Sequence, residues 1–537
     1  MLRPHEMRCP LTLSLRLKSV LLYSLGAFLL AVPLHAFNAT DAGSAVNNLP
    51  RFALVIGNGK YGDVPLKNAA NDARAIAEHL QRMGFDVTLK VDSTRGDMIE
   101  TIRAFGRKLA AQKGVGLFYF AGHGAQLGWR NYLIPVDAAI RNPAEMQQQA
   151  VDLETLLESI TRARNPMNVV ILDACRDNPF GPNVKLEQKG LSQIDAPPGT
   201  LLAYSTAPGN AAADGGGPNG LYTGYVLQEM QAPAAKIEDV LKRVRLNVRR
   251  DSRGQQVPWE STSLEQDFYF IPPKALKKLS LEESEAQFVE ELALWDTVKT
   301  AKERGPLEDY LRRFPSGKFS ELAQFRLDRV LAQSGEQAVQ AGDASRNAGN
   351  PFSKGTARVN LDYAIGDTYN YRQVDLSTSA ETRKYTLTIT EITDEQVVYN
   401  KGTQVRDLLG NGLKSNRGEF TGSEGAGAQF YVSDYSIGKK WTARYRVKGR
   451  DGIDSASEID FKVVAKEKIT VPAGEFDAFK VQGLGYSTRG YSLTYTYWVA
   501  PEQVRRIVAM EETFRGVKTN RVILSDRHEL VSFRQLR

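Results

Sequence analysis

The chain has 537 residues, too many for one hydrophobic core, so about three domains are expected. Its 42% hydrophobic and 24% charged residues are ordinary for a folded soluble protein and exclude a wholly disordered chain. The net charge of +7 is modest. The basic residues form neither a stripe with interleaved aromatics nor a known nucleic-acid motif, so no nucleic-acid partner is predicted.

The N-terminus, residues 1–36, has the pattern of an export signal. Its basic residues are Arg3, Arg8, Arg16 and Lys18. The apolar run VLLYSLGAFLLAVPL follows, and the small residue Ala36 stands at a plausible cleavage point. The run is short for a membrane-spanning helix, and no later segment is apolar enough to cross a bilayer. We therefore expect a cleaved signal peptide and a mature chain without a membrane span; an uncleaved anchor is the alternative.

The two cysteines of the chain are Cys9 and Cys175. Cys9 lies inside the leader, before the apolar run, and is not placed like a lipid-attachment cysteine. The mature chain would therefore keep one thiol and form no intramolecular disulfide. A single thiol in an oxidising, exported setting is a liability unless it has a chemical role. Cys175 is thus a candidate catalytic residue.

Residues 51–271 alternate strand patterns with helical patterns. Strands are expected at FALVIGN, FDVTLKVD, GVGLFYFAG, NVVILDA and GTLLAYSTAPG. Helices are expected at DARAIAEHLQRMG and over residues 96–112, 221–230 and 237–250. This alternation predicts an α/β domain with a mostly parallel sheet and helices on both faces. Functional sites in such sheets gather at the carboxyl ends of the strands.

Residues 280–334 have a different character. They predict three helical stretches, broken at Gly305–Pro306 and at Pro315–Gly317. The segment resembles a single tetratricopeptide-like unit. It would serve equally well as a spacer packed on its neighbours or as a peptide-binding groove.

The last part of the chain begins with a small, polar, glycine-containing stretch, residues 335–356, which has the composition of a linker. Residues 357–537 then alternate apolar and polar residues between turn signals. This pattern predicts an antiparallel β domain. Its tyrosines and Trp498 could form a binding face, although alternating aromatics more often fill a β core.

Two reactive side chains follow the ends of two predicted strands. His123 lies between glycines after the run LFYF, and Cys175 follows VVILDA. The flanking glycines would open a ligand's approach and permit unusual backbone angles. A cysteine nucleophile needs a base close in space, which adjacent parallel strands would supply. The alternatives are a turn histidine and a buried, inert cysteine, but the polar neighbours of the cysteine favour the nucleophile: Asp173, Arg176 and Asp177.

Several motifs between residues 51 and 271 belong together. In chain order they are ALVIGNGKY, NAANDA, FYFAGHG, NYLIPVDA, VVILDACRDNPF, AYSTAPGNAA and VPWESTSLEQDFYF. Together they resemble the caspase-like domain of bacterial metacaspase relatives, cysteine peptidases of the caspase clan (peptidase family C14). The resemblance implies the caspase–hemoglobinase fold, with His123 and Cys175, about fifty residues apart, as the catalytic dyad. It also implies that the backbone amides of Gly124 and Cys175 form the oxyanion hole.

The resemblance further implies cleavage after arginine or lysine. Animal caspases, which cut after aspartate, have glutamine two positions before the cysteine, where this chain has Asp173. Asp72, in NAANDA, matches the second acidic pocket residue of metacaspases. Asp72 could also be the N-cap of the helix that it opens, and the two roles are compatible. Protein or peptide substrates with basic residues are the expected partners.

Some positions depart from the metacaspase pattern. Ala69 and Ala121 stand where many metacaspases have Cys and Ser, so the depth of the pocket is left open. Pro182 and Asn183 occupy the stretch where the calcium-binding carboxylates of some metacaspases would be sought, and Asp177 is a poor substitute. The chain has no zinc pattern and no phosphate-cradling loop. No cofactor and no metal are predicted; dependence on calcium is the alternative, which the sequence does not support.

The sequence thus predicts an exported cysteine endopeptidase, periplasmic or secreted in a bacterial envelope. One alternative is a catalytically silent caspase-like scaffold. Another is an envelope-binding protein that acts through residues 357–537. The Pro/Gly-rich loop of residues 180–199 carries Lys185 and Lys189 and is a predicted site of self-cleavage.

Overall fold

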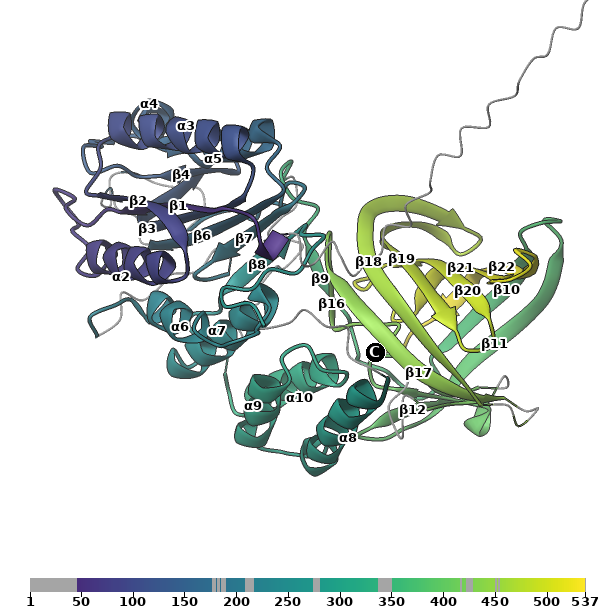
Figure 1. Ribbon diagram of the computed structural model, residues 1–537. Coiled ribbons are helices and arrows are strands. Elements are labelled where there is room, and N and C mark those ends of the chain that lie inside the picture. Colours follow the sequence, from purple (N-terminus) through teal and green to yellow (C-terminus); the bar gives the residue numbers. More distant parts are fainter. Residues whose placement is uncertain are drawn as a thin grey trace, which may run out of the picture.

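The computed structural model describes residues 46–175, 180, 184, 190–207, 217–273, 281–336, 350–415, 418–421, 428–449, 452 and 454–536. An α/β part, a helical part and a closed antiparallel sheet follow one another along the chain (Figure 1). The predicted leader and the predicted self-cleavage residues Lys185 and Lys189 lie outside the described residues.

The α/β part is built on a mixed sheet with the strand order β2-β1-β3-β6-β7-β8. Strands β1, β2, β3, β6 and β7 are parallel, whereas β8 runs antiparallel to β7. The main strands are β1 (Arg51–Gly57), β2 (Phe85–Val91), β3 (Val115–Leu127), β6 (Met167–Cys175), β7 (Thr200–Tyr204) and β8 (Trp259–Thr262). Two short strands, β4 (Arg130–Leu133) and β5 (Val151–Asp152), extend the sheet from the end of β3. The sheet confirms the predicted α/β class.

Helices cover both faces of this sheet (Figure 1). One face packs against α2 (Ala69–Arg82), α6 (Leu221–Glu229) and α7 (Ile237–Asp251). The other packs against α3 (Arg95–Gln112) and α5 (Leu153–Ala163), with the short η1 (Pro143–Glu145) and α4 (Met146–Gln149) nearby in the chain. Side chains alternate along a strand, so Tyr119 faces the first group while Phe118 and Phe120 face the second. Burial on both faces explains why LFYF is continuously apolar.

The helical part contains α8 (Leu281–Val298), α9 (Arg304–Arg313) and α10 (Ser320–Gln333). Trp295 stacks on Phe319 with ring centroids 5.2 Å apart at the centre of its core. Pro315–Gly317 separates α9 from α10, as predicted. The predicted break at Gly305–Pro306 is wrong, because both residues lie in the first turn of α9. A proline is tolerated there because its missing N–H has no partner within the helix.

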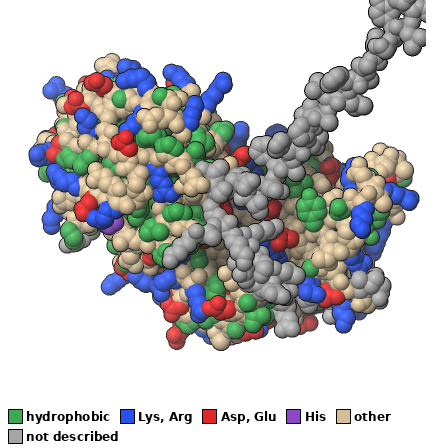
Figure 2. Space-filling view, in the orientation of Figure 1, with side chains coloured by type: hydrophobic (Ala, Val, Ile, Leu, Met, Phe, Trp, Pro, Cys, Tyr) green, Lys and Arg blue, Asp and Glu red, His purple; other side chains and the backbone are tan. Residues whose placement is uncertain are grey.

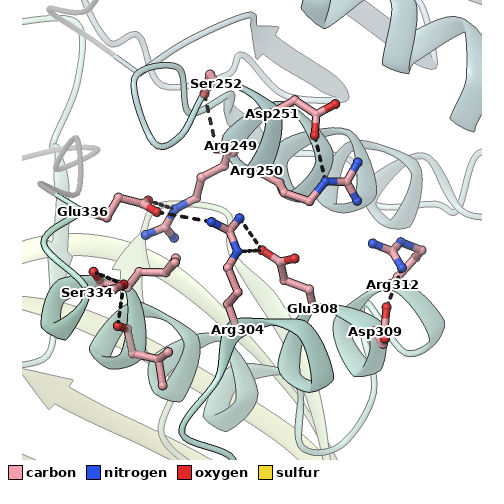
Figure 3. Close-up of polar contacts among 12 residues, drawn as sticks. Arg249, Arg250, Asp251, Ser252, Arg304, Glu308, Asp309, Arg312, Ser334 and Glu336 are labelled. Atoms are coloured by element: carbon pink, nitrogen blue, oxygen red, sulfur yellow. Dashed lines mark hydrogen bonds and ion pairs between the residues drawn. The ribbon is translucent and has the colours of Figure 1, made fainter.

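Ion pairs fix the helical part against α7 of the α/β part (Figure 3). Arg249 on α7 lies 2.6 Å from Asp328 on α10 and 2.9 Å from Glu336. Arg304 on α9 pairs with Glu308 at 2.6 Å and also approaches Glu336, at 4.0 Å. The helical part is therefore packed on the α/β part.

The C-terminal part is a closed antiparallel sheet in which β10 pairs with β22. Its strands are β10 (Thr368–Asp375), β11 (Glu381–Ile392), β12 (Gln396–Tyr399), β13 (Gln404–Asp407), β14 (Gly412–Ser415), β15 (Gly418–Thr421), β17 (Lys440–Gly449), β18 (Asp454–Val471), β19 (Gly474–Ser487), β20 (Tyr491–Val499), β21 (Ile507–Gly516) and β22 (Val522–Arg534). The turn η3 (Asn400–Gly402) follows β12, and β9 (Thr356–Arg358) pairs with β16 (Asp434–Ser436) outside the closed sheet. Trp498, Tyr369, Tyr399 and Tyr497 lie in its buried core. The antiparallel class is confirmed, and these aromatics fill a core.

Residues 350–356, at the end of the predicted linker, are packed against the α/β part. Asn350 donates a hydrogen bond to the Gln193 carbonyl at 2.8 Å, and the Asp195 N–H donates to the Phe352 carbonyl at 2.9 Å. Phe352 also packs against the core on the α3/α5 face of the sheet. The composition predicts a linker here, but these long-range contacts hold residues 350–356 against the α/β part.

The surface in Figure 2 has mixed charge. On that face, Lys and Arg side chains are interspersed with Asp and Glu over both the α/β part and the closed sheet. Within the described ranges, no helix is long and apolar enough to span a membrane.

Candidate active site

The predicted catalytic pair lies at the carboxyl edge of two neighbouring parallel strands. In the register of β3 with β6, His123 is the direct partner of Cys175. Paired strands lie about 4.8 Å apart, so the two backbones run side by side at this point. The side chain of Cys175 and the predicted neighbours Arg176 and Asp177 lie outside the described part of the chain. The topology therefore brings the two predicted residues together at the level of the backbone.

The His123 side chain is buried and held in one orientation. Only 1% of the residue is exposed. Its Nε2 lies 2.7 Å from the carbonyl oxygen of Val64, and its ring packs against that of Tyr61 with centroids 4.4 Å apart. A carbonyl oxygen only accepts hydrogen bonds, so Nε2 carries the hydrogen of this contact. In the neutral imidazole, Nδ1 is then the nitrogen with the basic lone pair.

The two glycines beside His123 permit close packing. A Cβ atom on Gly122 would lie 2.7 Å from the Tyr61 hydroxyl oxygen. A Cβ atom on Gly124 would lie 2.9 Å from the Ala174 Cβ. Neither glycine has a positive φ, so the chain does not use the unusual backbone angles that glycine permits at these two positions. The glycines let protein groups approach the histidine strand on both sides.

The amide of Gly124 points toward the cysteine strand. The His123 carbonyl accepts a hydrogen bond of 3.0 Å from the Ile134 N–H, just beyond β4. Backbone polar groups alternate between the two edges of a strand, so the N–H of the next residue, Gly124, is directed to the β6 edge. This is the edge at which the predicted oxyanion hole, made by the amides of Gly124 and Cys175, would lie.

Asp72 is buried on α2, with 3% of the residue exposed. Its carboxylate accepts hydrogen bonds from the Asn219 Nδ2 at 2.8 Å and from the Gly220 N–H at 3.0 Å. The prediction that Asp72 caps its own helix is wrong, because the N-cap of α2 is Asn68, and the Asp72 N–H donates to the Asn68 carbonyl. Asp72 instead binds the N-cap residue of α6, Gly220.

Asp173 is half-buried in β6 and connects to the same region of α6. Its carboxylate accepts a 2.6 Å hydrogen bond from the Thr223 hydroxyl. Because that hydrogen is used, the Tyr119 hydroxyl, also 2.6 Å from the Thr223 oxygen, donates to it. Burial raises the pKa of Tyr119 well above its usual value, and the charges of Asp173 and Asp72 raise it further. Both predicted pocket carboxylates therefore lie close to one buried tyrosine.

Sequence reasoning missed several residues of this site. Tyr61 lies in the motif ALVIGNGKY, but no short-range pattern reveals that its hydroxyl meets a strand 62 residues later. Tyr119 belongs to a continuously apolar strand, in which nothing marks its hydroxyl as part of a site. Thr223 belongs to a helix that contains no recognisable motif. Ala69 and Ala121, the departures from the metacaspase pattern, are both buried in the core between α2 and the sheet.

The described residues form no metal-binding cluster. Among the residues that the structure describes, no three His, Cys, Asp or Glu side chains are grouped so that they could hold a metal ion. The residues at the positions where calcium-binding carboxylates would be sought, Asp177, Pro182 and Asn183, lie outside the described ranges.

Comparison with known proteins agrees with the motifs. The family model of the caspase domain of peptidase family C14 matches residues 50–269. Mucosa-associated lymphoid tissue lymphoma translocation protein 1 of Homo sapiens and its homolog of Mus musculus are each 28% identical over 186 residues. The similar stretch covers 34% of this chain but only 22% of the human and 21% of the mouse protein. The resemblance to caspase-clan peptidases is confirmed for this segment.

Proposed function

We propose that this chain, with its caspase domain of the peptidase C14 type at residues 50–269, is a cysteine endopeptidase that cleaves after Arg or Lys. The observation that carries the proposal is the register of β3 with β6, in which His123 pairs directly with Cys175. A family-typical histidine and cysteine that occupy partner positions at the carboxyl edge of a sheet are suited to nucleophilic catalysis.

In the proposed reaction, the Cys175 sulfur attacks the carbonyl carbon of the substrate after His123 Nδ1 takes the thiol proton. The carbon–nitrogen bond of the peptide then breaks, and the imidazolium returns that proton to the leaving amine. Water hydrolyses the resulting thioester and frees the cysteine. The Val64 carbonyl supports the imidazolium, because it accepts a hydrogen bond from Nε2. The amides of Gly124 and Cys175 would stabilise the oxyanion, by roughly 3 kcal/mol for each donor.

Preference for a basic residue before the cleaved bond is supported by the two carboxylates beside Tyr119. Asp72 is held by α6 at its N-cap, and Asp173 by Thr223. A guanidinium can bridge two carboxylates with forked hydrogen bonds, whereas an ammonium is a single point of charge. We therefore infer a preference for Arg over Lys and rejection of acidic residues, whose charge would be buried beside like charges.

Export to the periplasm or beyond is supported by the basic, then apolar leader that ends near Ala36. Intact mass of the protein from the envelope fraction tests this: a chain that begins after Ala36 is expected, and one that begins at Met1 would be an anchored protein. The proposed reaction uses no metal and no organic cofactor.

The peptidase proposal is tested with a thiol-reactive peptide that ends in arginine, applied to the purified full chain. We expect labelling at Cys175, found by peptide mapping, and loss of labelling in His123→Ala. The matched probe that ends in aspartate should label at most weakly. Equal labelling by both probes would remove the specificity proposal. No labelling by either would favour the catalytically silent scaffold.

A further inference from the structure

Two arginines of the C-terminal part approach one another, one buried (Arg506) and one half-buried (Arg406), and buried charged side chains are rare. Arg506, directly before β21, is only 6% exposed. Arg406 in β13 pairs with Val397 of β12, which is 1% exposed and belongs to the core. Cross-strand partners share a face of the sheet, so Arg406 is on the core side as well. These residues belong to a part of the chain that the peptidase proposal does not use.

Both guanidinium groups converge on one carbonyl oxygen. Arg406 donates to the Gly410 carbonyl at 3.0 Å, and Arg506 reaches the same oxygen at 3.5 Å. Arg406 makes one further hydrogen bond, to Gln404 at 3.3 Å. The Nε atoms of both arginines are buried and have no hydrogen-bond partner among the described residues. A guanidinium has five N–H donors, so most of the donors of Arg506 meet no acceptor in the described part of the chain.

The neighbouring ionic groups are occupied with other partners. Arg505 is paired with the buried Asp367 at 2.7 Å and donates to the Leu536 carbonyl. Asp407 is next to Arg406 in the chain, but its carboxylate accepts hydrogen bonds from the Asn411 N–H and Nδ2, at 2.8 and 3.0 Å. Among the described residues, no carboxylate forms an ion pair with Arg406 or Arg506.

The surroundings of Arg506 suit an anion with an apolar portion. Its guanidinium carbon lies 5.7 and 5.9 Å from the ring centroids of Tyr399 and Tyr431. It lines a small cavity of about 30 Å³ that opens to solvent, together with Tyr363, Tyr431 and mainly aliphatic side chains. Burial, and then the like charge of Arg506, lowers the pKa of Arg406. A buried cation without a counter-charge among the described residues is costly, and an anion bound in the cavity beside Arg506 would offset that cost.

We propose that this end of the closed sheet binds a small organic anion, a carboxylate or phosphate carried by a short apolar group. The anionic oxygens would bind Arg506, with Arg406 beside it, and the apolar group would lie against Tyr363 and Tyr431. Charge-assisted, forked hydrogen bonds to a guanidinium are the strongest recognition that such a group can receive in a partly buried site.

The test uses the full chain and three probes: propionate, its neutral isostere propionamide, and inorganic phosphate. Dissociation constants come from ligand-observed NMR, with phosphate measured by competition. We expect propionate to bind at least about tenfold more tightly than propionamide, because the carboxylate alone can form charge-assisted hydrogen bonds. Propionate should also bind more tightly than inorganic phosphate. The reverse order would overturn the assignment of an apolar portion to the ligand.

Variants link the binding to the two arginines. Arg506→Gln and Arg406→Gln should each weaken propionate binding about tenfold or more. Arg521→Gln changes an exposed arginine directly before β22, which forms no ion pair among the described residues, and should leave binding unchanged. Should Arg506→Gln fail to fold, Arg506→Lys keeps the charge and should bind propionate more weakly, because the fork is lost. Equal affinity in the wild type and in both glutamine variants, or no binding by the wild type, would overturn the proposal.

Discussion

Replacing Gly122 by alanine tests whether the packing beside the histidine matters for catalysis. The new methyl carbon would lie 2.7 Å from the Tyr61 hydroxyl oxygen and 2.7 Å from the Phe120 Cζ, closer than Cβ atoms approach other atoms. The hydroxyl accepts the His123 N–H at 2.9 Å and donates to the Ile134 carbonyl at 3.0 Å, so moving it strains both hydrogen bonds. Overpacking of this kind costs about 1–3 kcal/mol, and each lost hydrogen bond about 1 kcal/mol.

The expected result of Gly122→Ala is a lower melting temperature and a fall in kcat/KM for an arginyl peptide of about ten- to a hundredfold. A displacement of a catalytic group by about 1 Å is enough for the larger figure. Gly224→Ala is the matched control, because a Cβ atom on Gly224 in α6 would meet nothing within 4 Å. The two variants are compared by thermal melting and by peptide hydrolysis. If Gly122→Ala keeps wild-type stability and activity, Tyr61 does not hold the histidine as described.

Other predictions concern the pocket, the processing loop and the closed sheet. Asp173→Asn should lower kcat/KM for arginyl peptides about thirtyfold or more, since loss of one charge partner costs roughly 2–5 kcal/mol. An unchanged alkylation rate of the Cys175 thiol would show that the loss comes from the substrate pocket. Full activity of the variant would contradict the role of Asp173 in that pocket. Incubated wild-type protein should acquire a new terminus after Lys185 or Lys189 that Cys175→Ala lacks; terminal sequencing that finds an intact, active chain would show that processing is not needed. Burial raises the pKa of Asp407 from 3.8 to about 6. The folded chain therefore binds this proton more tightly than the unfolded chain does. The free energy of unfolding should fall by up to about 3 kcal/mol as the pH rises from about 4 to 6. Denaturant titrations across this range should show a smaller slope in Asp407→Asn than in the wild type, and an identical slope in that variant would contradict the assignment.

The features that could be predicted from the sequence are those with local patterns. The apolar runs around LFYF and VVILDA predict buried parallel strands, and strands of that kind place His123 and Cys175 at the same edge of the sheet. The alternation after residue 357 likewise predicts antiparallel strands that bury their aromatics on one side. In each case the spacing of apolar residues along the strand predicts which faces of the sheet are buried.

The features that could not be predicted depend on contacts between distant segments. Asp72 lies where a helix cap is expected, but its carboxylate binds Gly220, 148 residues later. The composition of residues 350–356 is that of a linker, yet tertiary hydrogen bonds hold this segment against the α/β part. No sequence pattern distinguishes Arg506 from its neighbour Arg505. In the structure Arg505 is paired with Asp367, whereas Arg506 has no acidic partner among the described residues. The spacing of residues along the chain does not predict such contacts between distant segments.

The central claim, that His123 and Cys175 act as one catalytic unit, is tested by the hydrolysis of an arginyl peptide by the wild type, Cys175→Ala, His123→Ala and the double variant. Groups that act as a unit are not additive, so both single variants should lose activity almost completely and the double variant should resemble either one. Near-native circular dichroism of the variants provides the folding control. Substantial turnover by either single variant, above that of the double variant, would contradict the claim.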